Sequence, residues 1–136
     1  MQSACFAGLD TDIAATNQAI LPAGNWTPTP AEITNALVAI QACLDHPDQL
    51  SNYSKADAKS ILSHAKEYRV QFVGIVKNGQ KVIWCNFFPA PNGDREWFPE
   101  WKESKVQVED GGFWFWHIDY DPVTDKCLDF EPNGVA

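Results

Sequence analysis

The sequence predicts an α+β fold in which N-terminal helices pack on one face of a four- to five-stranded antiparallel meander sheet. Two features support this prediction. Apolar residues recur at helical spacing in the first half of the chain, whereas apolar and polar residues alternate in the second half, as they do in strands. An Asn-Gly pair at residues 78–79 separates two alternating segments, which is the strongest short signal for a β-hairpin. Helices followed by consecutive strands are typical of α+β domains.

Length and composition indicate one domain that spans residues 1–136. This length is close to the commonest domain size, and a hydrophobic content of 45% can fill one core. The formal net charge of −8 opposes binding to nucleic acid and to anionic membrane surfaces. No apolar run is long enough to cross a bilayer, so no membrane insertion is expected. We therefore expect a protein partner, preferably a basic one, and no oligomeric state is predicted.

Four widely spaced cysteines, without a Cys-x-x-Cys pair, favour two disulfides over a zinc site. They are Cys5, Cys43, Cys85 and Cys127. The expected pairs are Cys5 with Cys43 and Cys85 with Cys127. Disulfides persist in oxidising compartments, so the chain is predicted to be periplasmic or secreted, in a mature form without its signal peptide. The alternative is a cytosolic protein with four reduced, buried cysteines.

Three helices are predicted from the spacing of the apolar residues. They span Thr11–Leu21, Pro30–Leu44 and Lys55–Tyr68. The second has the clearest start, because Thr29 as N-cap and Glu32 three residues later form a capping box. The expected caps of the other two helices are Asp10 and Ser54.

The predicted hairpin pairs Val70–Lys77 with Gln80–Phe88. A two-residue turn places Lys77 opposite Gln80, and this register decides which residues share a face. The face expected to meet the helices carries Val70, Phe72, Ile83, Cys85 and Phe87, with Gly74 allowing close approach. The other face carries Gln71, Val73, Ile75, Val82, Trp84 and Asn86.

The rest of the chain is predicted to form a long loop and three further strands. The loop spans Pro89–Ser104, and the strands span Lys105–Asp110, Phe113–Tyr120 and Lys126–Glu131. Helices on one face of such a sheet are similar in outline to the cystatin and nuclear-transport-factor folds. The inhibitory cystatins carry a Gln-x-Val-x-Gly motif, and the nearest string here, at residues 71–74, lacks that spacing, so we do not infer protease inhibition from it.

An aromatic surface is the leading candidate for function, formed by the long loop and the sheet face away from the helices. Aromatic side chains in such a patch contribute most of the energy of many protein interfaces. The sequence thus favours a small exported binding protein, such as an inhibitor or an immunity-type partner of another exported protein. The candidate binding residues are Trp84, Trp97, Phe98, Trp101, Trp114, Trp116, Gln71 and Asn86.

Two alternatives remain open at this stage. A ligand-binding or hydrolytic domain would have a pocket between the sheet and the helices, lined by tryptophans and by inward polar groups. A structural or accessory domain would bury all of its aromatic side chains. The pocket residues in the first alternative are Trp84, Trp114 and Trp116, with Gln71, Asn86 or His117 as polar groups.

The sequence favours binding over catalysis, and no cofactor or metal is predicted. Cys85, His117 and Asp119 contain the residue types of a nucleophilic triad, but a disulfide would remove the thiol. Asp119, Asp121 and Asp125 are crowded in one turn, as calcium ligands are, yet the EF-hand pattern with its glycine at the sixth position is missing.

Overall fold

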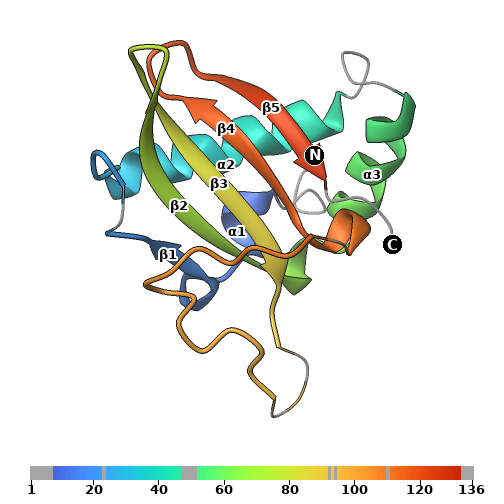
Figure 1. Ribbon diagram of the computed structural model, residues 1–136. Helices are drawn as coiled ribbons and strands as arrows, with labels where there is room; N and C mark the ends of the chain where they lie inside the picture. Colours follow the sequence, from blue (N-terminus) through green and yellow to red (C-terminus); the bar gives the residue numbers. More distant parts are fainter. Residues whose placement is uncertain are drawn as a thin grey trace.

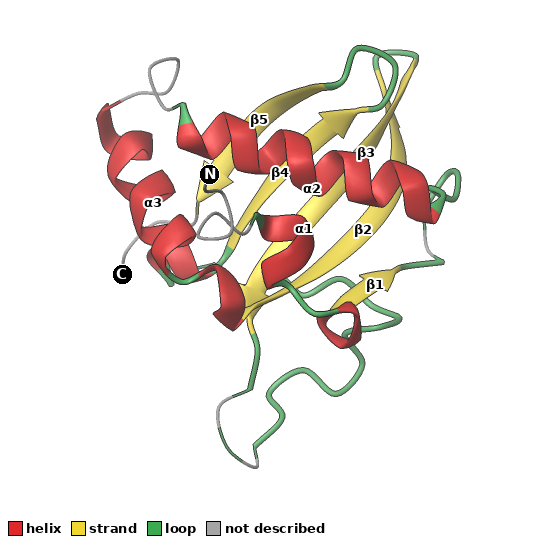
Figure 2. Ribbon diagram, turned by 180° about the vertical axis from the view of Figure 1, so that it is seen from behind, coloured by secondary structure: helices red, strands yellow, loops and turns green. Residues whose placement is uncertain are grey.

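Five strands form one mixed sheet in the part of the chain that the structure describes; two of the three helices lie against one of its faces, and the third packs beside the longest helix (Figures 1 and 2). The structure is a computed structural model that describes residues 8–22, 24–46, 52–91, 93, 95–109 and 111–132. Among these residues, no helix is long and apolar enough to cross a membrane. The helices are α1 (Leu9–Asp12), α2 (Pro30–Asp45) and α3 (Asn52–Ser63), and the strands are β1 (Gln18–Ile20), β2 (Tyr68–Lys77), β3 (Gln80–Pro89), β4 (Trp116–Asp121) and β5 (Lys126–Pro132).

The strand order confirms the α+β class and corrects the predicted topology. The order in the sheet is β1-β2-β3-β4-β5, and the last four strands pair antiparallel with their neighbours in sequence. However, β1 pairs parallel to β2, with Gln18 opposite Val70. The sheet is therefore mixed and is not a purely antiparallel meander.

The β2–β3 hairpin forms with the predicted register. Lys77 lies opposite Gln80, and Phe72 lies opposite Cys85. Asn78 and Gly79 have positive φ values of 51° and 78°, as the two central residues of a type I′ turn require. The face with Phe72 and Cys85 therefore packs against the helices, as predicted.

Helix α2 also starts as predicted. The Thr29 backbone N–H donates to Glu32 Oε1 at 2.9 Å, and the Glu32 N–H donates to Thr29 Oγ1 at 3.2 Å. This capping box satisfies two of the donors that a helix start leaves unpaired. Figure 2 shows α2 lying across the strands. Its buried side chains are Ile33, Ala36, Leu37, Ile40 and Leu44.

The predicted helix over Thr11–Leu21 is wrong. Only α1 is helical there, with Gly8 rather than Asp10 as N-cap, and a 3₁₀ turn over Ala15–Asn17 follows it. Residues 18–20 instead form β1, because the edge of β2 offers backbone groups for pairing. The apolar spacing that indicated one helix belongs to a short helix and a strand.

The third helix lies a few residues earlier than predicted. It starts at Asn52, so Ser54 is inside α3 and is not its cap, and it ends at Ser63. A 3₁₀ turn follows over Ala65–Glu67. Tyr68 is the first residue of β2 and is fully buried, because its ring packs edge-on against Phe87 and Trp116 in the core.

The predicted strand over Lys105–Asp110 is also wrong. Residues 105–108 have no regular secondary structure, and a 3₁₀ turn over Gly112–Trp114 precedes β4, which begins only at Trp116. The backbone of Val106 bonds to two side chains instead of to a neighbouring strand. The partners of this segment are therefore distant in sequence, and strand periodicity did not indicate them.

The centre of the space between the sheet and the helices is filled by side chains. The rings of Phe87 and Trp116 stack at 3.9 Å between centroids, and Tyr68 packs edge-on to both. Trp116 is 1% exposed, so its ring is enclosed by core side chains. Among the described residues, no pocket lined by Trp84, Trp114 and Trp116 together is therefore formed here, although hollows of about 380 and 450 Å³ remain between α2 and the edges of the sheet.

Gly74 allows a close backbone approach, although not to the helices. Its neighbour is the segment before α2, where Asn25 N–H donates to the Gly74 carbonyl at 2.7 Å. A Cβ atom at residue 74 would lie within 2.1 Å of the Trp26 carbonyl oxygen. Only glycine fits this position without a shift of the backbone.

We predict that Gly74→Ala lowers the free energy of unfolding by about 2 kcal/mol, because the new methyl group meets backbone atoms. Gly93→Ala is the control: its Cβ would meet nothing within 4 Å, so only the positive φ of 91° adds a cost, about 1 kcal/mol. Urea unfolding of both variants measures the difference. Equal losses would show that the contact with Trp26 has no energetic consequence.

Candidate binding groove on the open face of the sheet

The segment that follows β3 covers part of the sheet face opposite the helices. Phe88, Trp101 and Val106 form a small second core there. Phe98 packs edge-on against Phe88, with 5.6 Å between ring centroids. Trp101 is 4% exposed, so Trp101 and Phe98, both predicted as binding residues, pack this segment onto the sheet.

Two buried amides hold this segment in place. Gln71 Nε2 donates to the carbonyl oxygens of Trp101 and Ser104, at 2.6 and 2.7 Å. Its Oε1 accepts from Val106 N–H and from Asn86 Nδ2, both at 2.9 Å. Asn86 Nδ2 also donates to the Val106 carbonyl at 2.8 Å. Gln71 and Asn86 were predicted to contact a ligand, but these amide groups bind the protein's own backbone.

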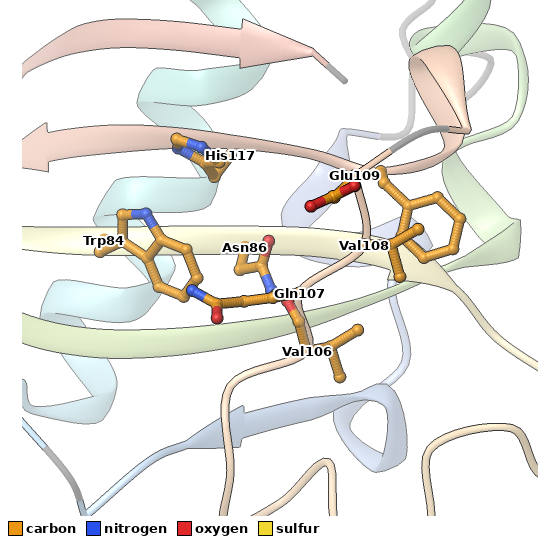
Figure 3. A pocket seen from close by; sticks show the side chains of 8 residues that line it. Trp84, Asn86, Val106, Gln107, Val108, Glu109 and His117 are labelled. Carbon is orange, nitrogen blue, oxygen red and sulfur yellow. Dashed lines mark hydrogen bonds between the residues drawn. The ribbon is translucent and has the colours of Figure 1, made fainter. Parts of the chain in front are cut away.

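A groove of about 390 Å³ lies beside this segment on the open sheet face. Its floor comes from β3 and β4, and residues 106–109 form one wall, as Figure 3 shows. The hydrogen bonds of Gln71 and Asn86 therefore hold this wall at a fixed position on the strands. The lining residues are Trp84, Asn86, Val106, Gln107, Val108, Glu109, Phe115 and His117.

Two aromatic rings define one end of the groove. Trp84 and His117 lie on neighbouring strands with ring centroids 5.4 Å apart and planes tilted by 40°. Both side chains are only partly buried. The Lys105 ammonium lies 5.0 Å from the centroid of the Trp84 ring, which is within the range of a cation–π interaction. The Trp84 face thus already accommodates a cation.

Carboxylates without an ion pair lie at the rim. Glu109 is exposed on the wall, and Glu131 lies opposite His117 in the pairing of β4 with β5. In the described ranges, neither Glu109 nor Glu131 has a basic partner. The rim therefore carries two carboxylates that form no ion pair with the described residues, while the one nearby ammonium, that of Lys105, lies over Trp84.

The other acidic residues of this region are bound within the protein. The Lys77 ammonium bridges Asp119 at 2.6 Å and Asp129 at 2.9 Å, and these bonds raise the Lys77 pKa above its ordinary value. Asp129 reaches Lys77 from an irregularity in the β4–β5 pairing, where its φ is 55°. Asp121 Oδ1 accepts from Val123 N–H at 2.8 Å, as in an Asx turn, and Asp125 accepts from Tyr120. No metal-binding cluster is present among the described residues.

The other predicted binding tryptophans lie in different parts of the structure, away from the groove. Trp97 is 65% exposed in the long loop, and the Arg95 guanidinium lies 4.5 Å from its ring centroid. Trp114 is on the helix side, next to His64 and Tyr68. Trp116 belongs to the core. Of the predicted binding residues, only Trp84 and Asn86 line the groove, and Trp97 alone is largely exposed.

The nucleophilic triad does not assemble. Cys85 is fully buried on the helix side, where desolvation raises its pKa well above the ordinary value. His117 and Asp119 are on the opposite face of the sheet, because Cys85 pairs with Ile118 between them. The predicted Cys85–Cys127 disulfide also does not fit, since β4 separates the two strands by about 10 Å. Cys5 lies outside the described residues.

The prediction missed Gln107 and Glu109 as groove residues, and Lys105 as the residue that lies over Trp84. All three were assigned to the predicted strand over Lys105–Asp110. A signal was available, because Gln71 and Asn86 are amides on a face that is otherwise apolar and must bind polar groups when buried. The segment that supplies those groups is the wall of the groove.

We predict that Gln71→Leu destabilises the protein by about 3 kcal/mol, because it leaves Asn86 and several backbone groups buried without partners. The Val106 amide should also exchange its hydrogen faster. Gln107→Leu makes the same change at an exposed site and should alter stability by less than about 0.5 kcal/mol. Urea unfolding and hydrogen exchange test this, and similar stabilities for the two variants would contradict the role of Gln71.

Comparison with known proteins gives no family for this chain. No protein-family model, curated protein or solved structure matches the chain. The function of the groove must therefore be inferred from the groove residues themselves.

Proposed function

We propose that this protein is an exported, non-catalytic binding protein that takes a basic segment of a partner protein into the groove on the open sheet face. An inhibitor or an immunity-type partner of another exported protein would act in this way. The observation that carries the proposal is the pair of Trp84 and His117 rings near Glu109 on the wall and Glu131 on β5, neither of which has a basic partner among the described residues.

The groove has the chemistry to hold an arginine. A guanidinium is planar and weakly hydrated, so it stacks on an indole face better than an ammonium does. Lys105 lies at that face in the unbound protein. A partner arginine could displace the Lys105 side chain, which is exposed and can move into solvent. Glu109 lies toward the other end of the groove (Figure 3), where it would pair with a second basic side chain of the same partner segment.

The surface next to the groove extends the contact toward Trp97. A second hollow of about 300 Å³ includes Trp97 and shares Val106 and Gln107 with the groove. An extended chain could therefore pass from His117 to Trp97 across the outer side of the same wall. Exposed tryptophans are frequent hot spots in protein interfaces, and the net charge of −8 would accelerate encounter with a basic partner.

A small polar ligand is the second candidate occupant of the groove. The volume of about 390 Å³ falls within the range of small-molecule sites, and the indole, amide and carboxylate groups suit a sugar. It differs from the alternative considered from the sequence, in which the pocket lies between the sheet and the helices. The outline similarity to the cystatin and nuclear-transport-factor folds also stays a proposal, supported by helices on one sheet face only.

The experiment is an NMR titration of the ¹⁵N-labelled protein with two soluble ten-residue peptides. One contains two arginines among glycine and serine, and the other has glutamates in their place. The arginine peptide should shift the indole N–H of Trp84 and the amide resonances of Gln107 and Glu109. Trp84→Leu should weaken binding about tenfold or more, and Glu109→Gln about threefold.

Val123→Ala is the matched control, because Val123 is 88% exposed in a turn and does not line the groove. Its affinity for the arginine peptide should equal that of the unmodified protein. Equal shifts with both peptides, or shifts confined to other surfaces, would refute a basic partner. Shifts at Trp84 with monosaccharides but not with the arginine peptide would favour the small-ligand candidate.

A further inference from the structure

Cys43 and Cys127 meet on the side of the sheet that faces the helices. Cys43 is in the last turns of α2, and Cys127 is in β5, opposite Tyr120. Both are partly buried and pack against the main core. Their side chains are in hydrogen-bond contact, and both sulfurs are free thiols in the structure. Two elements that are far apart in sequence therefore bring two thiols together.

Solvent reaches the edge of this thiol pair. A hollow of about 450 Å³ is lined by Cys127 and by Ala39 and Ala42, which precede Cys43 on the same helix. Tyr120 and Asp125 line the same hollow from the sheet side. A small reagent can therefore approach the pair from this side. Cys85, by contrast, is 0% exposed.

The contact activates one of the two thiols. A hydrogen bond from the Cys127 thiol lowers the pKa of Cys43 to about 7, although partial burial opposes this shift. The same contact, burial, and the charges of Cys43, Cys85 and Asp125 raise the pKa of Cys127. Cys43 is thus partly a thiolate at neutral pH, and the thiolate is the reactive form of cysteine.

We propose that Cys43 and Cys127 form an oxidisable dithiol that closes to a disulfide between α2 and β5. The oxidant is a disulfide such as oxidised glutathione. The Cys43 thiolate attacks one of its sulfurs, the oxidant's S–S bond breaks, and one glutathione thiolate leaves. Cys127 then loses its proton and attacks Cys43 Sγ, which releases the second glutathione. Two protein thiols are oxidised, and one glutathione disulfide is reduced to two thiols.

The cross-link would fix β5 to the helix layer. The two cysteines close a long loop that includes α3, β2, β3 and β4, so the unfolded chain would lose much of its freedom. β5 also carries Glu131 at the rim of the groove, on the face opposite the disulfide. The inference does not depend on the groove's function, because it rests on a separate pair of residues.

The test is peptide mapping after incubation of the reduced protein with oxidised glutathione. Protease digestion without reductant, followed by mass spectrometry, should give one cross-linked peptide pair that contains Cys43 and Cys127. Reduction should lower the melting temperature by an amount on the order of 10 °C. A cross-link of Cys43 to Cys5, or of Cys85 to Cys127, would overturn the proposal, as would two thiols that remain open to alkylation.

Single substitutions separate the roles of the three cysteines. In Cys43→Ala the dependence of the melting temperature on reductant should disappear, whereas Cys85→Ala should retain it. Alkylation of Cys43 with iodoacetamide should reach half its maximal rate near pH 7 in the reduced protein. In Cys127→Ala that midpoint should rise toward about 8.5, the value of an ordinary cysteine. An unchanged midpoint would refute the activating contact.

Discussion

The hydrogen-bonded pair of Gln71 and Asn86 is the interaction on which the open face of the sheet depends. These amides lie on adjacent strands, and each binds the backbone of the segment that crosses above them. A buried amide without partners would destabilise the sheet, and an irregular segment without backbone partners could not lie against it. The buried amides therefore require the crossing segment, and the segment requires the amides. The groove exists because this pairing holds its wall at a fixed place over β3.

Local signals in the sequence predicted the parts of the fold that depend on local contacts. The capping box of Thr29 and Glu32 places the start of α2, and the Asn78-Gly79 turn sets the register of the hairpin. Where distant residues decide the structure, prediction failed. Residues 18–20 became a strand because β2 has an edge to pair with, and residues 105–108 lost their strand because Gln71 and Asn86 bind Val106.

The candidate site was predictable only in part, for a related reason. Alternation along β3 correctly placed Trp84 and Asn86 on the face away from the helices. It could not distinguish an aromatic ring at the surface from one in the core, and Trp116 proved to be core. Gln107 and Glu109 line the groove because their segment crosses over the sheet. The spacing of apolar residues along the sequence does not predict such a crossing.

The irregularity at Asp129 has a consequence for the free edge of the sheet. β5 is the last strand in the order, and no other strand of the described ranges pairs with its outer side. A left-handed residue interrupts the regular spacing of those groups, and the carboxylates of Asp129 and Glu131 lie along the same edge. A second copy aligned edge to edge would meet both a broken ladder and like charges. The bend that brings Asp129 to Lys77 thus also makes pairing of a second strand along β5 less favourable.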